Sequence, residues 1–232
     1  MQAADAVPAA GFDKNAEPRI PEEERSYIYQ WFAGLFGREL SAEALWSYHD
    51  DAGQALLDRL GSYPLLAPLA ETVGDLIAEP QAIETKAMDL AGAFAWLFLG
   101  VGGRRSVPPY ESHYTSKRGL LFQEASAQTA AVLAEFDLHV DAAFPEPPDH
   151  IAVQLTVMAE FARRALEAAD PAQRQRSRDA QKTFLETRLL PWVGAFRDDC
   201  KAADRSRFYA MAASCLVDFL VADAHRIQAA PR

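Results

Sequence analysis

The side chains best suited to chemistry lie close together in one stretch, PEPPDH at residues 145–150. It supplies two carboxylates, Glu146 and Asp149, and the imidazole of His150, on a backbone that its prolines stiffen. Pro147 and Pro148 suit a first helical turn, where a missing N–H group costs no hydrogen bond. Apolar residues then recur at helical spacing, which predicts a helix with one buried stripe, formed by Ile151, Leu155, Met158, Ala162 and Ala165.

Two interpretations of these polar residues stay open. In the first, Asp149 caps the helix, because orphan N–H groups and the helix dipole favour a carboxylate there, and His150 is a surface or packed imidazole. In the second, Glu146, Asp149 and His150 form a polar rim on a rigid mouth, which would be a recognition site. Periodicity alone does not decide between them.

Metal binding and nucleophilic catalysis find little support. The chain has no HExxH motif, no Cys/His cluster and no calcium-binding loop pattern. Asp218 and His225 could share a helical face, but two such residues are better explained as a surface pair. His113 lies near Ser112 and Ser116, yet no GxSxG elbow is present to expose a nucleophile.

Phosphate binding and acid–base catalysis are weak alternatives. Gly100–Gly103 is glycine-rich and is followed by Arg104 and Arg105, which are weak candidates for a nucleotide site. The stretch lacks the GK[ST] ending of a P-loop, and a hinge needs the same glycines. Glu146 and Asp149 show no sign of the split environments that a catalytic carboxylate pair requires.

Binding through aromatic and acidic side chains is the remaining possibility. Aromatic anchors beside a few acids suit a peptide that carries arginines next to an apolar segment. We expect Trp96 and Phe98 to pack in the core, and Tyr110 and Tyr114 to lie near the surface because they follow two prolines. The acids of this predicted cleft are Glu111, Glu146 and Asp149.

The composition predicts a soluble cytoplasmic protein that does not bind nucleic acid. The 232 residues are 50% hydrophobic, enough for a sizeable core, and the net charge of -10 argues against a nucleic-acid partner. Cys200 and Cys215 are too far apart for a CxxC motif and are expected to be apolar fillers. The N-terminus is unlike a signal peptide, and the longest charge-free run, 90–103, is too short to cross a bilayer.

The elements that must position these residues are predicted to be helices throughout. Residues 1–19 lack periodicity and are expected to form a mobile, disordered tail. The segment 100–109, GVGGRRSVPP, is predicted to be a hinge between an N-terminal half (20–103) and a C-terminal half (110–226). The helix before it is apolar almost all round and is expected to be central. Helices are predicted at 21–37, 41–48, 51–60, 65–78, 81–99, 119–136, 149–169, 171–190, 191–203 and 205–226.

Five motifs, in order, resemble the TorD/DmsD/NarJ family of molybdoenzyme maturation chaperones. They cover nearly the whole chain from 25 to 226, and each alone is modest. PEPPDHI at 145–151 is similar to the family's E-P-x-D-H signature. The others are WFAGLFGREL at 31–40, LAGAFAWLFL at 90–99, VPPYESHY at 107–114 and FYA at 208–210. Within the family, the details resemble the TorD branch, whose members are chaperones of trimethylamine N-oxide reductase.

The resemblance implies a single compact all-helical domain at 20–232, of about ten helices in two halves, which in the family can exchange halves in a domain-swapped homodimer. It implies a non-enzymatic chaperone without a cofactor. Its partners would be an apo molybdoreductase and that enzyme's twin-arginine signal peptide, which it would hold before molybdenum-cofactor insertion and Tat export. The positions implied for peptide binding are Leu97, Phe98, Tyr110, Glu111, Tyr114, Glu146, Pro147, Asp149 and His150.

The sequence departs from the family pattern at two places, and two other functions stay open. The 20-residue tail before the first helix and the extra proline in Val107-Pro-Pro differ from the family pattern, and the second could stiffen the hinge. One alternative is a weak GTP-binding or GTP-hydrolysing regulator that uses Arg104 and Arg105. The other is an all-α scaffold without a peptide site.

Overall fold

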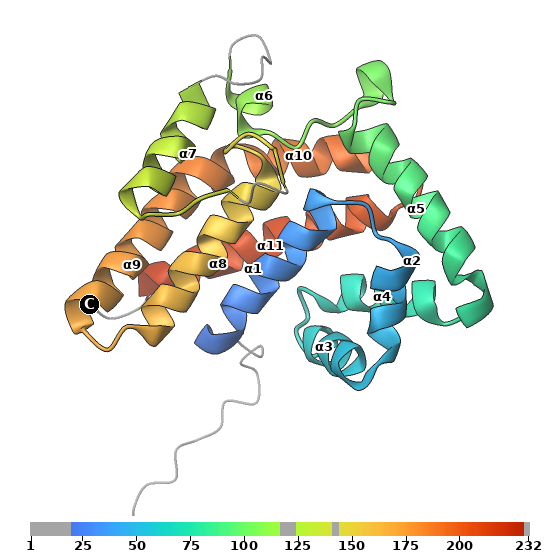
Figure 1. Cartoon of the computed structure of the whole chain (residues 1–232), viewed down its shortest axis with the longest axis horizontal. Helices are drawn as coiled ribbons and strands as arrows, with labels where there is room; N and C mark the ends of the chain where they lie inside the picture. Colours follow the sequence, from blue (N-terminus) through green and yellow to red (C-terminus); the bar gives the residue numbers. More distant parts are fainter. Residues whose placement is uncertain (1–19, 117–123, 141–143, 230–232) are drawn as a thin grey trace, which may run out of the picture.

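The computed structural model describes residues 20–116, 124–140 and 144–229, and within them the predicted all-α class is confirmed (Figure 1). No strand occurs in these ranges beyond one isolated bridge between Tyr110 and His150. The expected tail at 1–19 lies outside the described residues. The α-helices are α1 (Glu22–Gly37), α2 (Ala42–Trp46), α3 (Asp51–Gly61), α4 (Ala67–Ile77), α5 (Ile83–Phe98), α6 (Glu111–Thr115), α7 (Glu124–Glu135), α8 (Ile151–Glu167), α9 (Pro171–Phe184), α10 (Leu190–Ala203) and α11 (Phe208–Ala229). Short helical turns are η1 (Ser47–His49), η2 (Pro80–Ala82), η3 (Gly103–Arg105) and the π-helical η4 (Leu185–Leu189).

Local chemistry explains most of the helix ends. Glu22 opens the acidic first turn of α1, where carboxylates complement the helix dipole. The Oγ atom of Ser41 accepts a hydrogen bond from the amide of Ala44 at 3.1 Å, so Ser41 caps α2 as predicted. Asp50 caps α3 and Asp170 caps α9 in the same way. The predicted starts of α2, α3 and α9 are therefore confirmed, because their caps are local in sequence.

Helices α1 and α8 form the centre of the molecule, side by side in Figure 1 although far apart in sequence. Their close approach uses small residues, because a Cβ atom at Gly37 would lie 3.2 Å from the Cβ of Ala152. Phe32 of α1 and Leu155 of α8 are fully buried. Burying one such side chain stabilises the fold by roughly 1.5–3 kcal/mol.

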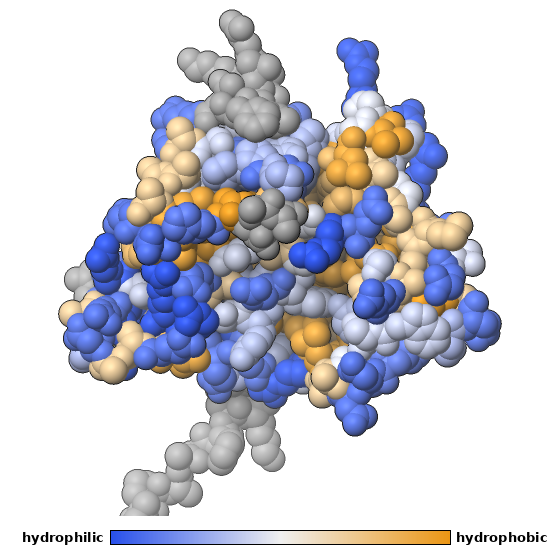
Figure 2. Space-filling view, in the orientation of Figure 1, coloured by the Kyte–Doolittle hydropathy of each residue, from blue (hydrophilic) through white to orange (hydrophobic). Residues whose placement is uncertain are grey.

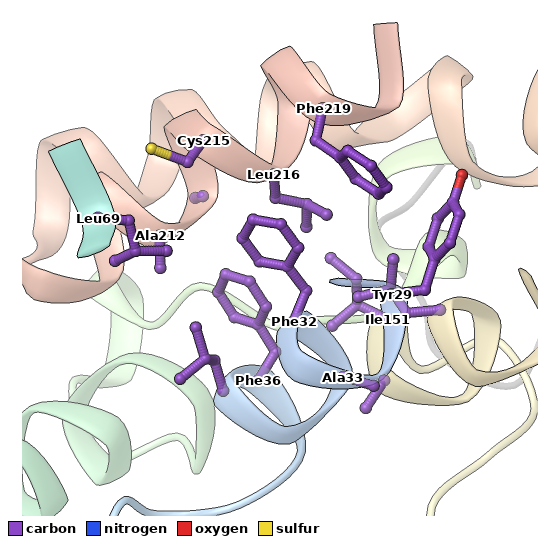
Figure 3. Close-up of a cluster of buried hydrophobic side chains, with 14 of the residues drawn as sticks. Tyr29, Phe32, Ala33, Phe36, Leu69, Ile151, Ala212, Cys215, Leu216 and Phe219 are labelled. Carbon is purple, nitrogen blue, oxygen red and sulfur yellow. The ribbon is translucent and has the colours of Figure 1, made fainter. Parts of the chain in front are cut away.

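A buried cluster joins α1 and α8 to α4 and α11 (Figure 3). Tyr29 and Phe32 contact the ring of Phe219 with centroid distances of 4.8 and 6.0 Å. Beside them, the Arg25 guanidinium donates two hydrogen bonds to the carboxylate of Asp223, which also accepts one from the Tyr29 hydroxyl. By length and composition α11 could cross a membrane, but most of its apolar stretch is buried in this core.

The expectation that α5 would be central is wrong. This helix lies at the outer edge of the molecule, on the side opposite α7 and α9 (Figure 1). Phe94, Leu97 and Phe98 pack inward, whereas Met88 is 73% exposed and Leu99, just after the helix, is 58% exposed. Apolar composition all round the helix could not show which of its faces would find a neighbour.

The glycine-rich segment after α5 is a turn fastened to the end of that helix. The amide of Gly102 donates to the carbonyl of Trp96 at 3.0 Å, and the amide of Val107 donates to the carbonyl of Leu97 at 2.6 Å. Gly100 and Gly103 adopt positive φ angles of 80° and 60°, which glycine tolerates best. The division into halves at this turn, and any exchange of halves between chains, stay predictions.

Gly102→Ala is expected to lower the free energy of unfolding by about 2 kcal/mol. A Cβ atom at this position would lie only 2.6 Å from the backbone oxygen of Trp96, so the turn would have to shift. Urea unfolding followed by circular dichroism measures the change. The matched control is Gly92→Ala, where a Cβ atom meets nothing within 4 Å, and which should stabilise the helix by about 0.5–1 kcal/mol. Equal stability of Gly102→Ala and wild type would contradict the described turn.

Candidate functional site

Two of the stretches singled out in the sequence lie against each other through a short antiparallel bridge. The amide of Glu111 donates to the carbonyl of Asp149 at 3.0 Å, and the amide of Ile151 donates to the carbonyl of Pro109 at 2.8 Å. The segment after the glycine-rich turn is thereby fixed to the segment that leads into α8. The structure thus brings Tyr110 and Glu111 together with Asp149 and His150.

Asp149 caps α6 rather than α8. Its Oδ2 atom accepts from the amide of Ser112 at 3.0 Å and from the Ser112 hydroxyl at 2.5 Å. Its side chain is fully buried, so Asp149 lies neither on an exposed rim nor at the cap of the following helix. Both interpretations drawn from the sequence are wrong for this residue, because its partner is 37 positions away along the chain.

His150 takes the capping position of α8. Its Nδ1 atom accepts a hydrogen bond from the amide of Ala152 at 3.1 Å, which requires the neutral imidazole. The ring is buried, and burial lowers the pKa of His150 from 6.5 to about 4. Its edges pack against Tyr110 and Phe144, with ring centroids 5.0 and 5.3 Å away. The packed imidazole of the first interpretation is confirmed, and the exposed rim of the second is wrong.

Glu111 is the centre of a buried polar cluster that the sequence did not reveal. Its carboxylate accepts from the Gln154 amide group at 2.5 Å and pairs with Arg188 at 3.2 Å. Burial raises the pKa of Glu111 to about 7, against the opposing effects of Arg188 and Gln154, and nearby Asp149 raises it further. Gln154 is a fully buried amide in an otherwise apolar helix start, and that oddity was the one available sequence signal.

The exposed part of this region is smaller than expected. Leu97 and Phe98 lie in the core, where Phe98 contacts Phe36, Phe94, Phe196 and Tyr209. Phe98 is therefore confirmed as a core residue, and neither residue lines an open cleft.

Tyr110 and Tyr114 are each half-buried, and Tyr114 stacks on Trp192 at 5.4 Å. Glu146 and Pro147 remain partly exposed. The Glu146 carboxylate accepts a hydrogen bond from the Tyr110 hydroxyl at 2.8 Å. This pair is the exposed, charged part of the region.

A groove of about 460 Å³, lined by both apolar and polar residues, lies near this exposed pair. Phe144 lines the groove, and its carbonyl accepts from the amide of Glu146 at 2.8 Å, so the carboxylate lies two residues from the groove wall. Small and aliphatic residues of α1, α7 and α8 and of positions 138–140 form part of the walls: Ala33, Gly34, Gly37, Leu133, Leu138, Val140, Ala152, Val153 and Val157. Polar residues also line the groove: Gln30, Arg38, His139, Thr156 and Glu160.

The groups considered for other chemistries do not converge. Within the described ranges no group of three or more His, Cys, Asp or Glu residues could hold a metal ion, and Asp218 and His225 are both exposed. The hydroxyl of Ser112, which was considered for nucleophilic catalysis, donates its hydrogen bond to the Asp149 carboxylate. Arg104 and Arg105 are exposed on η3, after a turn that follows a helix and not a strand, unlike a P-loop.

Comparisons with known proteins support the family resemblance. The family model described as nitrate reductase delta subunit matches residues 64–198. The chaperone protein TorD of Photobacterium profundum is 33% identical over 202 residues, covering 87% of this chain and 93% of its own. TorD of Vibrio parahaemolyticus is 30% identical and covers 89% and 96% of the two chains. A solved structure from Archaeoglobus fulgidus, described as a proposed redox enzyme maturation protein, is 20% identical and covers 90% and 99%. Its TM-score is 0.43, too low to carry an argument.

Proposed function

Since this chain belongs to the nitrate reductase delta subunit family, which includes the TorD chaperones, we propose that it is a non-enzymatic, client-specific maturation chaperone. Its client is an apo molybdoreductase, and trimethylamine N-oxide reductase is the candidate that the relatives named TorD favour. The protein works in the cytoplasm, binds the client's twin-arginine signal peptide, and keeps the enzyme competent for cofactor insertion before Tat export.

The observation that carries this proposal is the Glu146–Tyr110 pair near a groove that has an aliphatic wall. A signal peptide has arginines followed by an apolar segment. Within the described ranges the Glu146 carboxylate accepts a side-chain hydrogen bond from the Tyr110 hydroxyl alone, so it retains capacity for a guanidinium, which forms strong bidentate pairs with carboxylates. Glu160, the acid that lines the groove, is already paired with Arg163 and Arg164.

The groove supplies the place for the apolar segment. Part of its wall is aliphatic, and Phe144 connects that part to the carboxylate end. Tyr110 and Phe144 both contact the buried His150 ring, and the bridge between residues 109–111 and 149–151 fixes the position of that ring. In this proposal Asp149, His150 and Glu111 position the site, and Glu146 with Phe144 contacts the peptide.

Glu146→Gln is expected to weaken binding of a twin-arginine peptide about tenfold, because an amide cannot form the charged pair. The same change should leave the affinity for the Ala-Ala variant of that peptide unaltered. Phe144→Ala should weaken both peptides to a similar extent, since it removes groove wall and not charge. Calorimetric titration measures all four affinities.

The matched control is Glu79→Gln, an exposed carboxylate in the linker before η2, which should change neither affinity. A Glu146→Gln protein that binds the twin-arginine peptide as tightly as wild type would remove Glu146 from the site. Equal losses for the Arg-Arg and Ala-Ala peptides would show that Glu146 does not contact the arginines.

A further inference from the structure

Apolar side chains are exposed where α5 ends, away from the groove between α1 and α8. Leu99 is 58% exposed and Val101 is 66% exposed, and Trp96 is half-buried one turn earlier. Figure 2 shows a hydrophobic patch at this end of the molecule, beside the projecting turn that follows α5 in Figure 1. Apolar side chains gathered in this way on a surface mark a contact site more often than scattered ones do.

Three arginines surround these apolar residues. Arg104 and Arg105 are exposed on η3, and the guanidinium of Arg205 stacks over the Trp96 ring at 4.9 Å from its centroid. Among the residues that the structure describes, none of the three forms an ion pair. The nearest acid in sequence, Asp204, accepts hydrogen bonds from Ser206 and from the amide of Ala210 at the start of α11.

The patch is held rigid by the backbone. The amide of Gly102 and the Ser106 hydroxyl both donate to the carbonyl of Trp96, at 3.0 and 3.2 Å. The turn that carries Val101 and the two arginines is therefore fixed to the helix end that carries Trp96. A preorganised surface binds with a smaller loss of conformational entropy.

We infer that this arginine–apolar patch, defined by Trp96, Leu99, Val101, Arg104, Arg105 and Arg205, docks an acidic protein segment that also carries leucine or aromatic side chains. Unpaired guanidinium groups favour carboxylates, and the apolar residues favour a chain that can cover them. A basic signal peptide would be repelled here, so this surface is distinct from the groove proposed above and does not depend on it.

The overall charge separates this partner from two others. The chain carries a net charge of -10, so an anionic bilayer would repel most of the protein while attracting only this patch. A second copy of the same acidic chain would meet the same repulsion. A short acidic segment of another protein can reach the patch without bringing a large like-charged surface with it.

The test uses a fluorescein-labelled synthetic peptide built from Glu, Leu and Trp, and measures anisotropy against the full chain. The inference predicts saturable binding that weakens about tenfold in Arg104→Ala/Arg105→Ala and also weakens as salt is added. Leu99→Ser/Val101→Ser should weaken it comparably. The matched control, Arg176→Ala/Lys182→Ala on exposed positions of α9, removes the same charge elsewhere and should bind like wild type. Circular dichroism checks that each variant is folded.

Three results would overturn the inference. The first is the absence of saturable binding at low salt, and the second is equal affinity in the patch variants and the α9 control. The third is binding to phosphatidylglycerol vesicles, or concentration-dependent dimerisation in ultracentrifugation, that is lost in the patch variants while the peptide does not bind. A peptide with Gln in place of Glu serves as the charge control, and it should bind the wild-type protein about tenfold more weakly than the Glu peptide does.

Discussion

Asp149→Ala is expected to lower the free energy of unfolding by about 3 kcal/mol. The carboxylate is fully buried and accepts two hydrogen bonds from Ser112, one from the amide and one from the hydroxyl. Removing it leaves both donors unpaired in the interior, and each buried unpaired group carries its own desolvation cost. The start of α6 would also lose the only side-chain acceptor found for it in the described structure.

Graded variants separate the hydroxyl hydrogen bond from the effect of the charge. Ser112→Ala removes only the hydroxyl donor, whereas Asp149→Asn keeps an oxygen that can accept from both Ser112 donors and removes the negative charge, so each should cost about 1 kcal/mol. Urea unfolding at neutral pH measures the series. A fully stable Asp149→Ala protein would mean that Asp149 does not cap α6. For the same reason Glu146, not Asp149, is the residue to replace in binding experiments, because loss of Asp149 would perturb the fold.

The second large effect is a pair of opposing pH dependences from Glu111 and His150. The folded-state pKa of Glu111 is about 7 against an ordinary 4.5, so the folded chain binds an extra proton between these values. Its contribution to stability therefore falls as pH rises through that window, by about 3 kcal/mol in total. The folded-state pKa of His150 is about 4 against 6.5, so the unfolded chain binds the extra proton. Its contribution therefore rises with pH from about 4 to 6.5, by a similar amount.

In the wild type, the opposite effects of Glu111 and His150 on the pH dependence of the unfolding free energy largely cancel. Single variants should reveal each effect separately. The stability difference between wild type and Glu111→Gln should decrease as pH rises from about 4.5 to 7. The difference between wild type and His150→Asn, which preserves a capping acceptor, should increase from about pH 4 to 6.5. Urea unfolding of the three proteins across this pH range gives both differences in unfolding free energy. The contributions of all other titrating groups cancel when each difference is taken. Slopes of the same sign, or no slope, would contradict the described burial of the two groups.

The fold class and the local helix ends could be predicted because their causes are local. Ser41, Asp50 and Asp170 cap the helices that follow them, and a pattern of nearby residues suffices to place them. The position of α5 could not be predicted, since its apolar composition does not say which neighbours the chain provides. The rigidity of the turn at Gly102 depends on hydrogen bonds to the Trp96 carbonyl, which composition does not encode.

At the candidate site, too, local sequence patterns predicted the stretches involved but not the contacts between them. The stretch at 145–151 was found from the sequence, and so were its counterparts at 110–114. Their mutual pairing, and the roles of Ser112, Gln154 and Arg188, arise from contacts between residues at least 37 positions apart. A carboxylate just before a helix normally caps that helix, and only the three-dimensional arrangement shows that Asp149 caps α6 and leaves α8 to His150.

The most direct test of the central proposal is calorimetric titration of the wild-type protein with the twin-arginine signal peptide of a molybdenum reductase, alongside its Ala-Ala variant. The account predicts saturable binding that weakens about tenfold when the arginines are replaced, because the charged pair with Glu146 is lost. Equal binding of both peptides, or binding of neither, would contradict it.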